Sequence, residues 1–209
     1  MSKFVKTFIF ILSVCSLLVF PQLAFAQWPS DLDGGGNGSG QAPQMQRPKT
    51  VNTQPQRQSH KKPRQSGMIP VSKFGMNFQF PASWQTQEGL QDPVIFIAFL
   101  STADNSFRDN IVICAEDLSQ SMDIQQYFDL NLKQLENIKI LGKGKVTIDG
   151  YEGRVLRHSS NTQSGLAIQQ EQIFLVVGTK GYVITITAKP NRFEQSIKDA
   201  YRLVNTITF

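Results

Sequence analysis

The chain has 209 residues, enough for one domain with additional segments, and its formal net charge is +5. The charge is unevenly placed: residues 1–26 carry +2, residues 27–66 carry +4, and residues 67–209 carry −1. Because the part of the chain that is rich in apolar residues is nearly neutral, the sequence argues against a nucleic-acid-binding domain, and no nucleic-acid partner is expected.

Residues 1–26 have the pattern of an export signal. Two lysines precede a mostly apolar stretch at 8–20, and Pro21 ends this stretch. The triplet Ala-Phe-Ala at 24–26 supplies the small residues that a signal peptidase reads. We therefore expect cleavage after Ala26 and a mature chain in the cell envelope, either in the periplasm or outside the cell.

Two alternatives are open for this segment. A retained segment would anchor the protein, although its apolar stretch is shorter than the roughly 20 residues that span a bilayer. Lipidation at Cys15 is disfavoured because the bulky Val14 precedes it. We expect contact with the membrane to be transient or to occur through an uncleaved N-terminal segment. Cleavage would leave Cys114 as the single thiol, without an internal disulfide.

Residues 27–67 are predicted to be a disordered basic linker. In 27–66, 22 residues are Gln, Pro, Gly or Ser, and the few large apolar residues have no period. Such a segment buries too little apolar surface to offset the entropy lost on ordering. The cluster HKKPR at 60–64 has the charge to contact an anionic envelope polymer, although a solvated linker is the simpler interpretation.

The pattern changes at Met68, where the predicted domain of residues 68–209 begins. An alternating stretch at 71–80 predicts one strand that buries the side chains of Phe74, Met76, Phe78 and Phe80 and ends at Pro81. Continuous apolar runs at 93–101 and 110–118 predict strands that are covered on both faces.

A helix is predicted to begin after Asp123, which is expected to be its N-cap. Apolar residues recur there at three- and four-residue steps, at Ile124, Tyr127, Phe128, Leu132, Leu135 and Ile138. Gly142 and Gly144 are expected to mark the end of this helix.

The dipeptide Asp149-Gly150 predicts a tight hairpin turn, because both of its central positions favour positive φ. The strands of this hairpin are expected at 145–148 and 151–159. The sequence NTQSG at 161–165 predicts the next turn.

A second predicted hairpin pairs residues 166–178 with 181–190 around Thr179-Lys180. A closing helix is expected at about 191–205, with one apolar face formed by Phe193, Ile197, Ala200, Tyr201 and Val204. The predicted order is β-β-β-α-β-β-β-β-α. The fold class is α/β (α+β): a mainly antiparallel sheet of about six or seven strands, covered by helices in an α/β/α sandwich.

Four stretches resemble the PsbP-like and DcrB-like domains, and together they cover residues 68–209. They are GMNFQFPASW, the helix DIQQYFDLNLKQLE, the hairpin DGYEGRVLRHSS, and YVITITAKP before the last helix. The resemblance implies a Mog1/PsbP-type fold. It also implies a mostly non-catalytic function, because members include extrinsic photosystem subunits, envelope lipoproteins and protein-binding adaptors. DcrB-like envelope proteins often carry a lipidated cysteine, which is not expected in this chain.

The domain contains few residues suited to catalysis. His158 is its single histidine, and Ser160 shares its strand face at about 7 Å along the strand, too far for a hydrogen bond. Cys114 lies among apolar residues, where a thiol packs as a small hydrophobic side chain. No spacing of acidic, Cys or His residues indicates a metal site, and no cofactor is expected. A hydrolase that uses His158 is kept as an alternative.

A polar stretch between residues 151 and 172 is the candidate recognition surface. Its members are Tyr151, Arg154, Arg157, His158, Gln170 and Gln172. If NTQSG closes the hairpin, Arg154 faces Glu171 and Arg157 lies near Ile168. The simpler interpretation of these residues is then a cross-strand ion pair between Arg154 and Glu171.

The sequence therefore predicts an exported, non-enzymatic envelope protein whose domain binds another envelope component, most readily a protein. One alternative is a small periplasmic hydrolase. The other is a structural tether, in which the basic linker binds an anionic polymer and the domain acts as a spacer.

Overall fold

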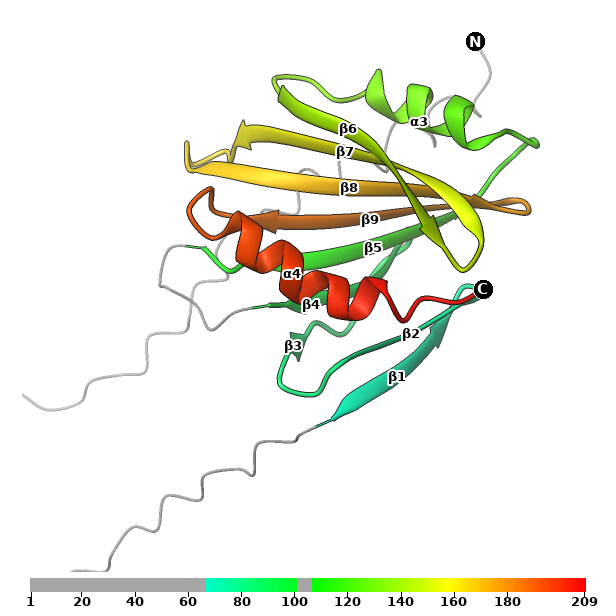
Figure 1. Cartoon of the computed structure of the whole chain (residues 1–209), viewed down its shortest axis with the longest axis horizontal. Helices are drawn as coiled ribbons and strands as arrows, with labels where there is room; N and C mark the ends of the chain where they lie inside the picture. Colours follow the sequence, from blue (N-terminus) through cyan, green and yellow to red (C-terminus); the bar gives the residue numbers. More distant parts are fainter. Residues whose placement is uncertain (1–66, 101–106) are drawn as a thin grey trace, which may run out of the picture. The chain divides into compact units, whose positions relative to one another are not determined.

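The computed structural model describes residues 67–100 and 107–209. The predicted leader and all of the predicted linker except Gly67 lie outside this part of the chain. The described residues form a two-stranded hairpin, a seven-stranded sheet and two helices (Figure 1). The hairpin consists of β1 (Met68–Lys73) and β2 (Met76–Pro81).

All neighbouring strands of the large sheet are antiparallel, and their order is β3-β4-β5-β9-β8-β7-β6. The strands are β3 (Gln85–Thr86), β4 (Val94–Phe99), β5 (Asn110–Asp117), β6 (Lys139–Ile148), β7 (Tyr151–Asn161), β8 (Ala167–Val177) and β9 (Lys180–Ala188). Helix α3 (Ile124–Leu132) follows β5, and α4 (Phe193–Val204) follows β9. The predicted antiparallel sheet of six or seven strands with two helices is confirmed.

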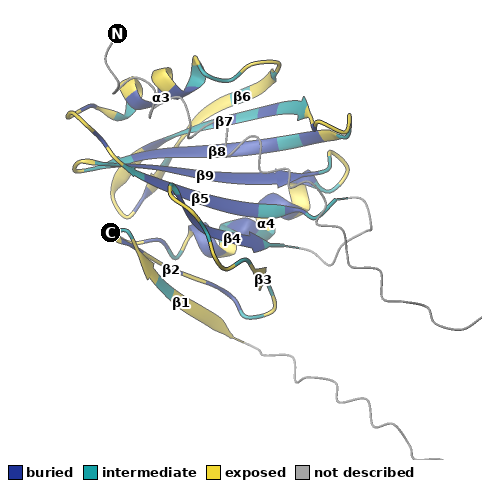
Figure 2. Cartoon of the chain, turned by 180° about the vertical axis from the view of Figure 1, so that it is seen from behind, coloured by how far each residue is buried: buried dark blue, intermediate teal, exposed yellow. Residues whose placement is uncertain are grey.

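Alternation along the strands gives the sheet two apolar sides. The side that we call the α4 side packs against α4 and the β1–β2 hairpin and includes Ile113, Ile173, Leu175 and Ile184. The opposite side, the α3 side, contacts α3 through β7 and β8 and includes Val112, Leu156, Phe174 and Val183. The central strands are buried along most of their length, as a sheet between two layers requires (Figure 2).

The single strand predicted over 71–80 is wrong, because the chain reverses at Phe74-Gly75. Both residues have positive φ, 54° and 81°, and Lys73 pairs with Met76 across a two-residue turn. The Tyr182 hydroxyl donates a hydrogen bond to the Phe74 carbonyl at 2.9 Å and helps to hold the turn. The expected apolar face is otherwise present, since Met76, Phe78 and Phe80 are buried.

Helix α3 begins as predicted and ends earlier. Asp123 accepts a hydrogen bond from the Gln126 backbone at 2.8 Å, and the Gln126 side chain accepts one from the Asp123 backbone at 3.1 Å. After Leu132 the chain turns instead of continuing to Ile138. Gly142 and Gly144 lie within strand β6, so the prediction that they end the helix is wrong.

The β6–β7 turn is the predicted one, with φ of 48° at Asp149 and 81° at Gly150. The β8–β9 turn lies at Gly178-Thr179, one residue earlier than predicted, because Val177 pairs with Lys180.

The predicted β7–β8 register is wrong by three residues. Arg154 pairs with Phe174, and Arg157 pairs with Glu171. The physical reason is a five-residue loop at 162–166 that includes Leu166. The Leu166 backbone donates to the Thr162 hydroxyl at 3.1 Å, and its carbonyl accepts from the Thr162 backbone at 2.9 Å.

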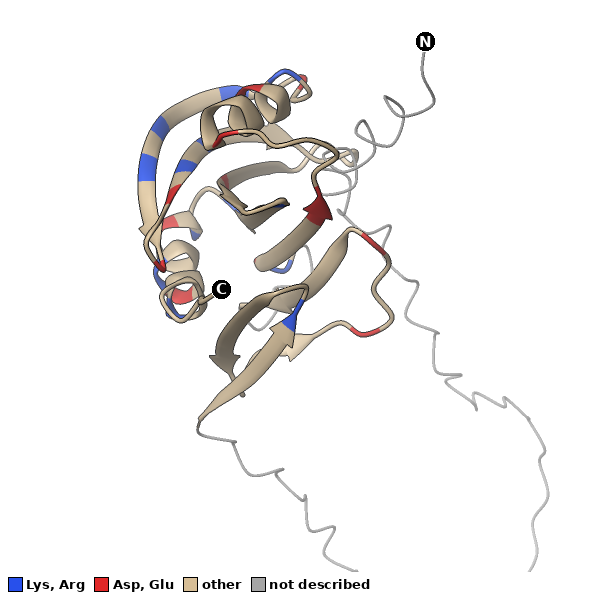
Figure 3. Cartoon of the chain, turned by 90° about the vertical axis from the view of Figure 1, so that its right-hand side faces the viewer, with Lys and Arg blue, Asp and Glu red and all other residues tan. Residues whose placement is uncertain are grey.

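The long edge strand β6 is protected by charge. Lys139, Lys143 and Lys145 are exposed along it, and a bulge interrupts its pairing with β7 between Ile140 and Gly142. Basic positions follow this outer strand in Figure 3. Lysines and bulges of this kind hinder edge-to-edge association of sheets. The other edge strand, β3, has only two residues.

Candidate functional site

The six predicted recognition residues lie on two different sides of the sheet. Tyr151 and Arg157 belong to the α4 side, together with Ile148 and Glu171, with which they pair. The α3 side carries Arg154, His158, Gln170 and Gln172. The prediction of one continuous surface is therefore wrong, because neighbouring positions of a strand face opposite ways.

Three of the six residues make contacts that hold the fold together. The ring of Tyr151 meets the edge of Phe209, with centroids 5.5 Å apart. Arg154 donates to the Gln125 side chain of α3 at 2.9 Å. Arg157 forms an ion pair with the buried Glu171 of β8.

The other three residues form the centre of a buried polar cluster on the α3 side. His158 pairs with Gln170, which pairs with Thr187, and Gln172 pairs with Thr185. We call these five residues the polar cluster. Side chains that pair directly across strands lie about 5 Å apart, so the cluster is contiguous. Only one side-chain hydrogen bond joins its members, from Gln170 Nε2 to Thr187 Oγ1 at 3.1 Å.

Several polar atoms of this cluster have no hydrogen-bond partner in the structure. They are both ring nitrogens of His158, the amide nitrogen and oxygen of Gln172, and Oγ1 of Thr185. The three residues are 1%, 0% and 0% exposed, respectively. A buried polar group without a partner costs about 1–3 kcal/mol, so a group of three is unusual in a stable domain. Because its residues are almost completely buried, the cluster belongs to the interior of the domain and not to its exposed surface.

Sequence reasoning identified His158, Gln170 and Gln172 but missed Thr185 and Thr187. The available signal was the alternation Ile-Thr-Ile-Thr at 184–187. In a strand that is covered on both sides, this alternation places hydroxyl groups on one of the buried sides. The sequence predicts this stretch only as one strand of the second hairpin.

The surroundings of His158 differ from those of a catalytic histidine. A hydrolase would need a carboxylate in hydrogen-bond contact with the imidazole, and no described carboxylate accepts such a bond. Burial lowers the pKa of His158, and the neighbouring Gln172 amide opposes part of that shift. The imidazole is therefore held in its neutral form at neutral pH.

Cys114 lies on the α3 side and is 1% exposed. Cys114 is not a free thiol in the structure. The expectation of a single thiol therefore applies only to a chain that has lost Cys15. In the described residues, no three His, Cys, Asp or Glu side chains gather as metal ligands would.

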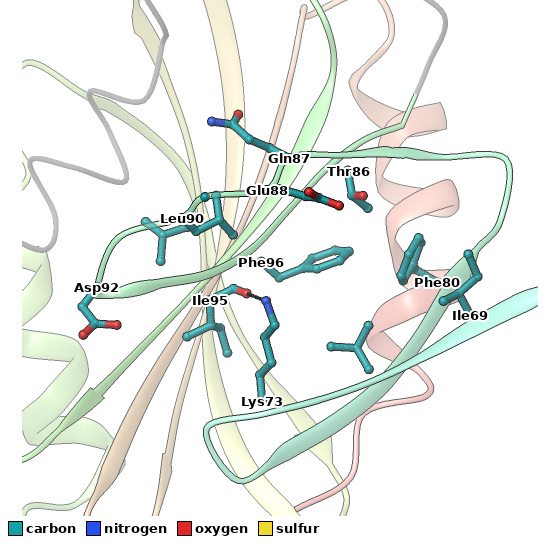
Figure 4. A pocket seen from close by; sticks show the side chains of 13 residues that line it. Ile69, Lys73, Phe80, Thr86, Gln87, Glu88, Leu90, Asp92, Ile95 and Phe96 are labelled. Atoms are coloured by element: carbon teal, nitrogen blue, oxygen red, sulfur yellow. Dashed lines mark hydrogen bonds between the residues drawn. The ribbon is translucent and has the colours of Figure 1, made fainter.

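A cleft of about 610 Å³ lies between the β1–β2 hairpin and the segment from β3 to β4 (Figure 4). Phe80, Ile95 and Phe96 are among its apolar lining residues. Lys73 donates a hydrogen bond to the Ile95 carbonyl at 3.2 Å within the cleft. Sequence reasoning missed this cleft because it depends on the hairpin turn at Phe74. The charged side chains in its lining do not converge on one point, so the cleft has apolar walls and no cluster of charged groups suited to catalysis.

Comparisons with solved structures give the fold. LpqN of Mycobacterium tuberculosis, involved in cell envelope biogenesis, matches with a TM-score of 0.53 and 16% identity over 68% of this chain and 90% of LpqN. The described domain has the Mog1/PsbP-like fold.

Two further matches have lower TM-scores. Cyanobacterial PsbP (CyanoP) of Synechocystis sp. PCC 6803 gives 0.48, with 11% identity over 68% of this chain and 92% of CyanoP. PA94 of Pseudomonas aeruginosa, a protein of unknown function, gives 0.45, with 19% identity over 65% of this chain and 94% of PA94. No family model and no curated protein sequence matches the chain.

The Mog1/PsbP-like domain includes two helices, α3 of 9 residues and α4 of 12 residues. Neither of these described helices is long and apolar enough to cross a bilayer.

Proposed function

We propose that the chain is exported to the cell envelope and binds another envelope component, a protein, without catalysing a reaction. The observation that carries this proposal is an export leader pattern followed by a domain in which no described carboxylate accepts a hydrogen bond from His158. The leader pattern at 1–26 supports export. The fold shared with LpqN, a protein involved in envelope biogenesis, is consistent with this location.

Cell fractionation combined with chemical cross-linking in intact cells tests this proposal. We expect mass spectrometry to find Gln27 as the first residue of the protein in the envelope fraction, with a cross-linked envelope protein attached. A cytosolic protein that keeps Met1 would contradict export. An envelope protein that yields no adduct at several cross-linker lengths would contradict binding.

The hydrolase alternative is tested by substitution of its two candidate residues. A panel of ester and amide substrates is offered to the exported protein and to its His158→Ala and Ser160→Ala variants. We expect no turnover by any of the three proteins. Turnover that both substitutions abolish, in variants that keep their circular dichroism spectrum, would establish the hydrolase and overturn the proposal.

The tether alternative is tested by deletion of residues 27–66. If the domain is the binding part, the shortened protein keeps its cross-linked partner and remains in the envelope. Loss of the partner after this deletion, with the domain still folded, would instead assign binding to the basic linker.

A further inference from the structure

A second pocket lies at the end of the sheet where β6 begins. Its volume is about 540 Å³, and residues of β6, β7 and β8 and of the neighbouring loops line it. Lys139, Ser159 and Gln169 form one row across these three strands, because Lys139 pairs with Ser159, which pairs with Gln169. Side chains that pair directly across strands lie about 5 Å apart, so the row is one continuous polar wall.

The lining of this pocket is suited to an anion. Lys139 is the single charged residue in it, so no carboxylate would repel an anion there. The lining also has hydroxyl and amide side chains, at Asn137, Ser159, Ser160, Asn161 and Gln169. Across the described residues, Lys139, Ser159 and Gln169 make no side-chain hydrogen bond or ion pair with another residue. An unpaired ammonium group beside hydroxyl and amide donors is able to bind a phosphate group.

The charges around the pocket also favour an anion. Residues 133–145 contain four lysines and one glutamate. Lys145 is paired with Glu152 at 3.3 Å, so three of these lysines have no described ion-pair partner. The one carboxylate of β8, Glu171, is already paired with Arg157. This end of the sheet therefore carries an excess of positive charge at its surface.

Two exposed apolar side chains follow the pocket along β6. Ile140 and Leu141 come directly after Lys139 and are 46% and 47% exposed. Leu141 has no pairing partner on β7, because it is the extra residue of the bulge between Ile140 and Gly142. The beginning of β6 is exposed to solvent (Figure 2). Exposed aliphatic side chains beside several lysines are the combination that binds the interface of an anionic bilayer.

We infer that this end of the sheet docks on the surface of an anionic phospholipid bilayer, with a lipid phosphate beside Lys139 in the pocket and with Ile140 and Leu141 inserted between the lipid headgroups. The contact goes beyond the proposed binding of an envelope protein and does not depend on it. A few lysines and two aliphatic side chains give weak and reversible binding, because stable anchoring takes stronger signals. The contact also gives a role to an exposed Ile-Leu pair on an edge strand that lysines otherwise protect.

Co-sedimentation with lipid vesicles tests the site. The purified exported protein is mixed with vesicles of phosphatidylglycerol and phosphatidylcholine in equal parts, or of phosphatidylcholine alone. We expect about tenfold tighter binding to the anionic vesicles at low ionic strength, because the unpaired lysines are attracted to the lipid phosphates. Added sodium chloride should reduce this preference. Equal binding to the two kinds of vesicle, or no binding to either, would overturn the inference.

Matched variants make the binding specific to this end of the sheet. Lys139→Gln should weaken binding to the anionic vesicles about fivefold, whereas Lys198→Gln, at an exposed position of α4, should change it by about twofold or less. Combining Ile140→Ser with Leu141→Ser should weaken binding about tenfold, because two aliphatic side chains no longer enter the bilayer. Ile69→Ser, on β1 and 37% exposed, should leave binding unchanged. Circular dichroism checks that each variant is folded.

The basic linker needs a control of its own, because it also carries positive charge. Lys61→Gln and Lys62→Gln are therefore introduced together, with and without the substitutions at Lys139, Ile140 and Leu141. We expect the substitutions in the domain to cause the same relative losses in both backgrounds. Vesicle binding that is lost with the linker lysines and kept by the domain variants would overturn the inference.

Two further results would also overturn it. Soluble glycerophosphoglycerol that displaces the vesicles at equal phosphate concentration would show a site for a free anion in place of a membrane surface. A polyglutamate peptide that binds more tightly than the vesicles would show a site for an acidic protein segment. A protein that cross-links to an envelope protein but binds both kinds of vesicle equally keeps the proposed function and loses only this inference.

Discussion

At the scale of single residues, close packing fixes the contact between α3 and the sheet. Gly181 of β9 lies beneath the ring of Tyr127, whose hydroxyl donates a hydrogen bond to Glu116 at 2.8 Å. A Cβ atom at position 181 would lie only 2.7–2.8 Å from three atoms of that side chain. The glycine is therefore needed for the close approach of the tyrosine ring.

Gly181→Ala should destabilise the domain by about 1–3 kcal/mol, because the buried Tyr127 ring must shift. The free energy of unfolding in urea measures the effect. Gly144→Ala is the matched control, because its Cβ would lie 3.9 Å from the nearest atom, which belongs to Val155. Equal losses in the two variants would contradict this account of the contact.

His158 gives the stability a pH dependence whose sign follows from its lowered pKa. The unfolded chain binds a proton near pH 6.5, whereas the folded chain binds it only at lower pH because burial disfavours the charged ring. The unfolded state therefore holds more protons in this window, and the free energy of unfolding falls as the pH drops below about 6.5.

Urea unfolding at pH 7.5, 6.5 and 5.5 measures this dependence. We expect His158→Gln to lose most of the decline between pH 6.5 and 5.5. His60→Gln, which removes the other histidine of the sequence, should keep it. An unchanged slope in the His158 variant would show that another group titrates in this range.

At the scale of elements, a buried carboxylate connects α4 to the sheet. Glu171 of β8 is 1% exposed and accepts hydrogen bonds from Arg157 at 2.5 Å and from the Tyr201 hydroxyl at 2.9 Å. Arg157 also lies 3.4 Å from Glu194 of the helix. Burial and the nearby Glu171 raise the pKa of Tyr201, so this hydroxyl stays protonated and can donate.

Arg157→Gln should cost about 1–3 kcal/mol in the free energy of unfolding at neutral pH, because a buried carboxylate loses its charged donor. Lys145→Gln breaks an exposed pair with Glu152 and should cause no measurable loss. If both variants lose the same free energy of unfolding at pH 7, the buried Arg157–Glu171 pair stabilises the domain no more than the exposed Lys145–Glu152 pair, which contradicts this account.

The elements that depend on local chemistry were predictable from the sequence. Asp149-Gly150 specifies a tight turn, and Asp123 with Gln126 specifies a helix start, whatever the rest of the chain does. The turn at Phe74-Gly75 was missed because phenylalanine rarely adopts positive φ and the apolar alternation continues across the turn.

The features that depend on long-range packing were not predictable in the same way. The β7–β8 register was predicted wrongly because Leu166 belongs to the loop. The local sequence pattern does not show where this loop ends. The polar residues at 158, 170 and 172 were predicted to belong to a recognition surface. Strand pairing is needed to see that these residues are buried and that they lie beside Thr185 and Thr187 of β9.

At the scale of the whole molecule, a Mog1/PsbP-like domain presents two unlike sides. The α4 side is closed by the helix and the β1–β2 hairpin, whereas the α3 side has one short described helix and the polar cluster. Our account assigns binding to this domain and not to the basic linker. Ser159 and Ser160 are adjacent on β7, both half-buried, and face opposite sides, so they offer a matched pair of probes.

The most direct test replaces each of these serines in turn with a photo-crosslinking phenylalanine analogue in the exported protein and irradiates intact cells. The account predicts an adduct with an envelope protein from at least one of the two positions. A folded, exported protein that yields no adduct from either position would contradict it.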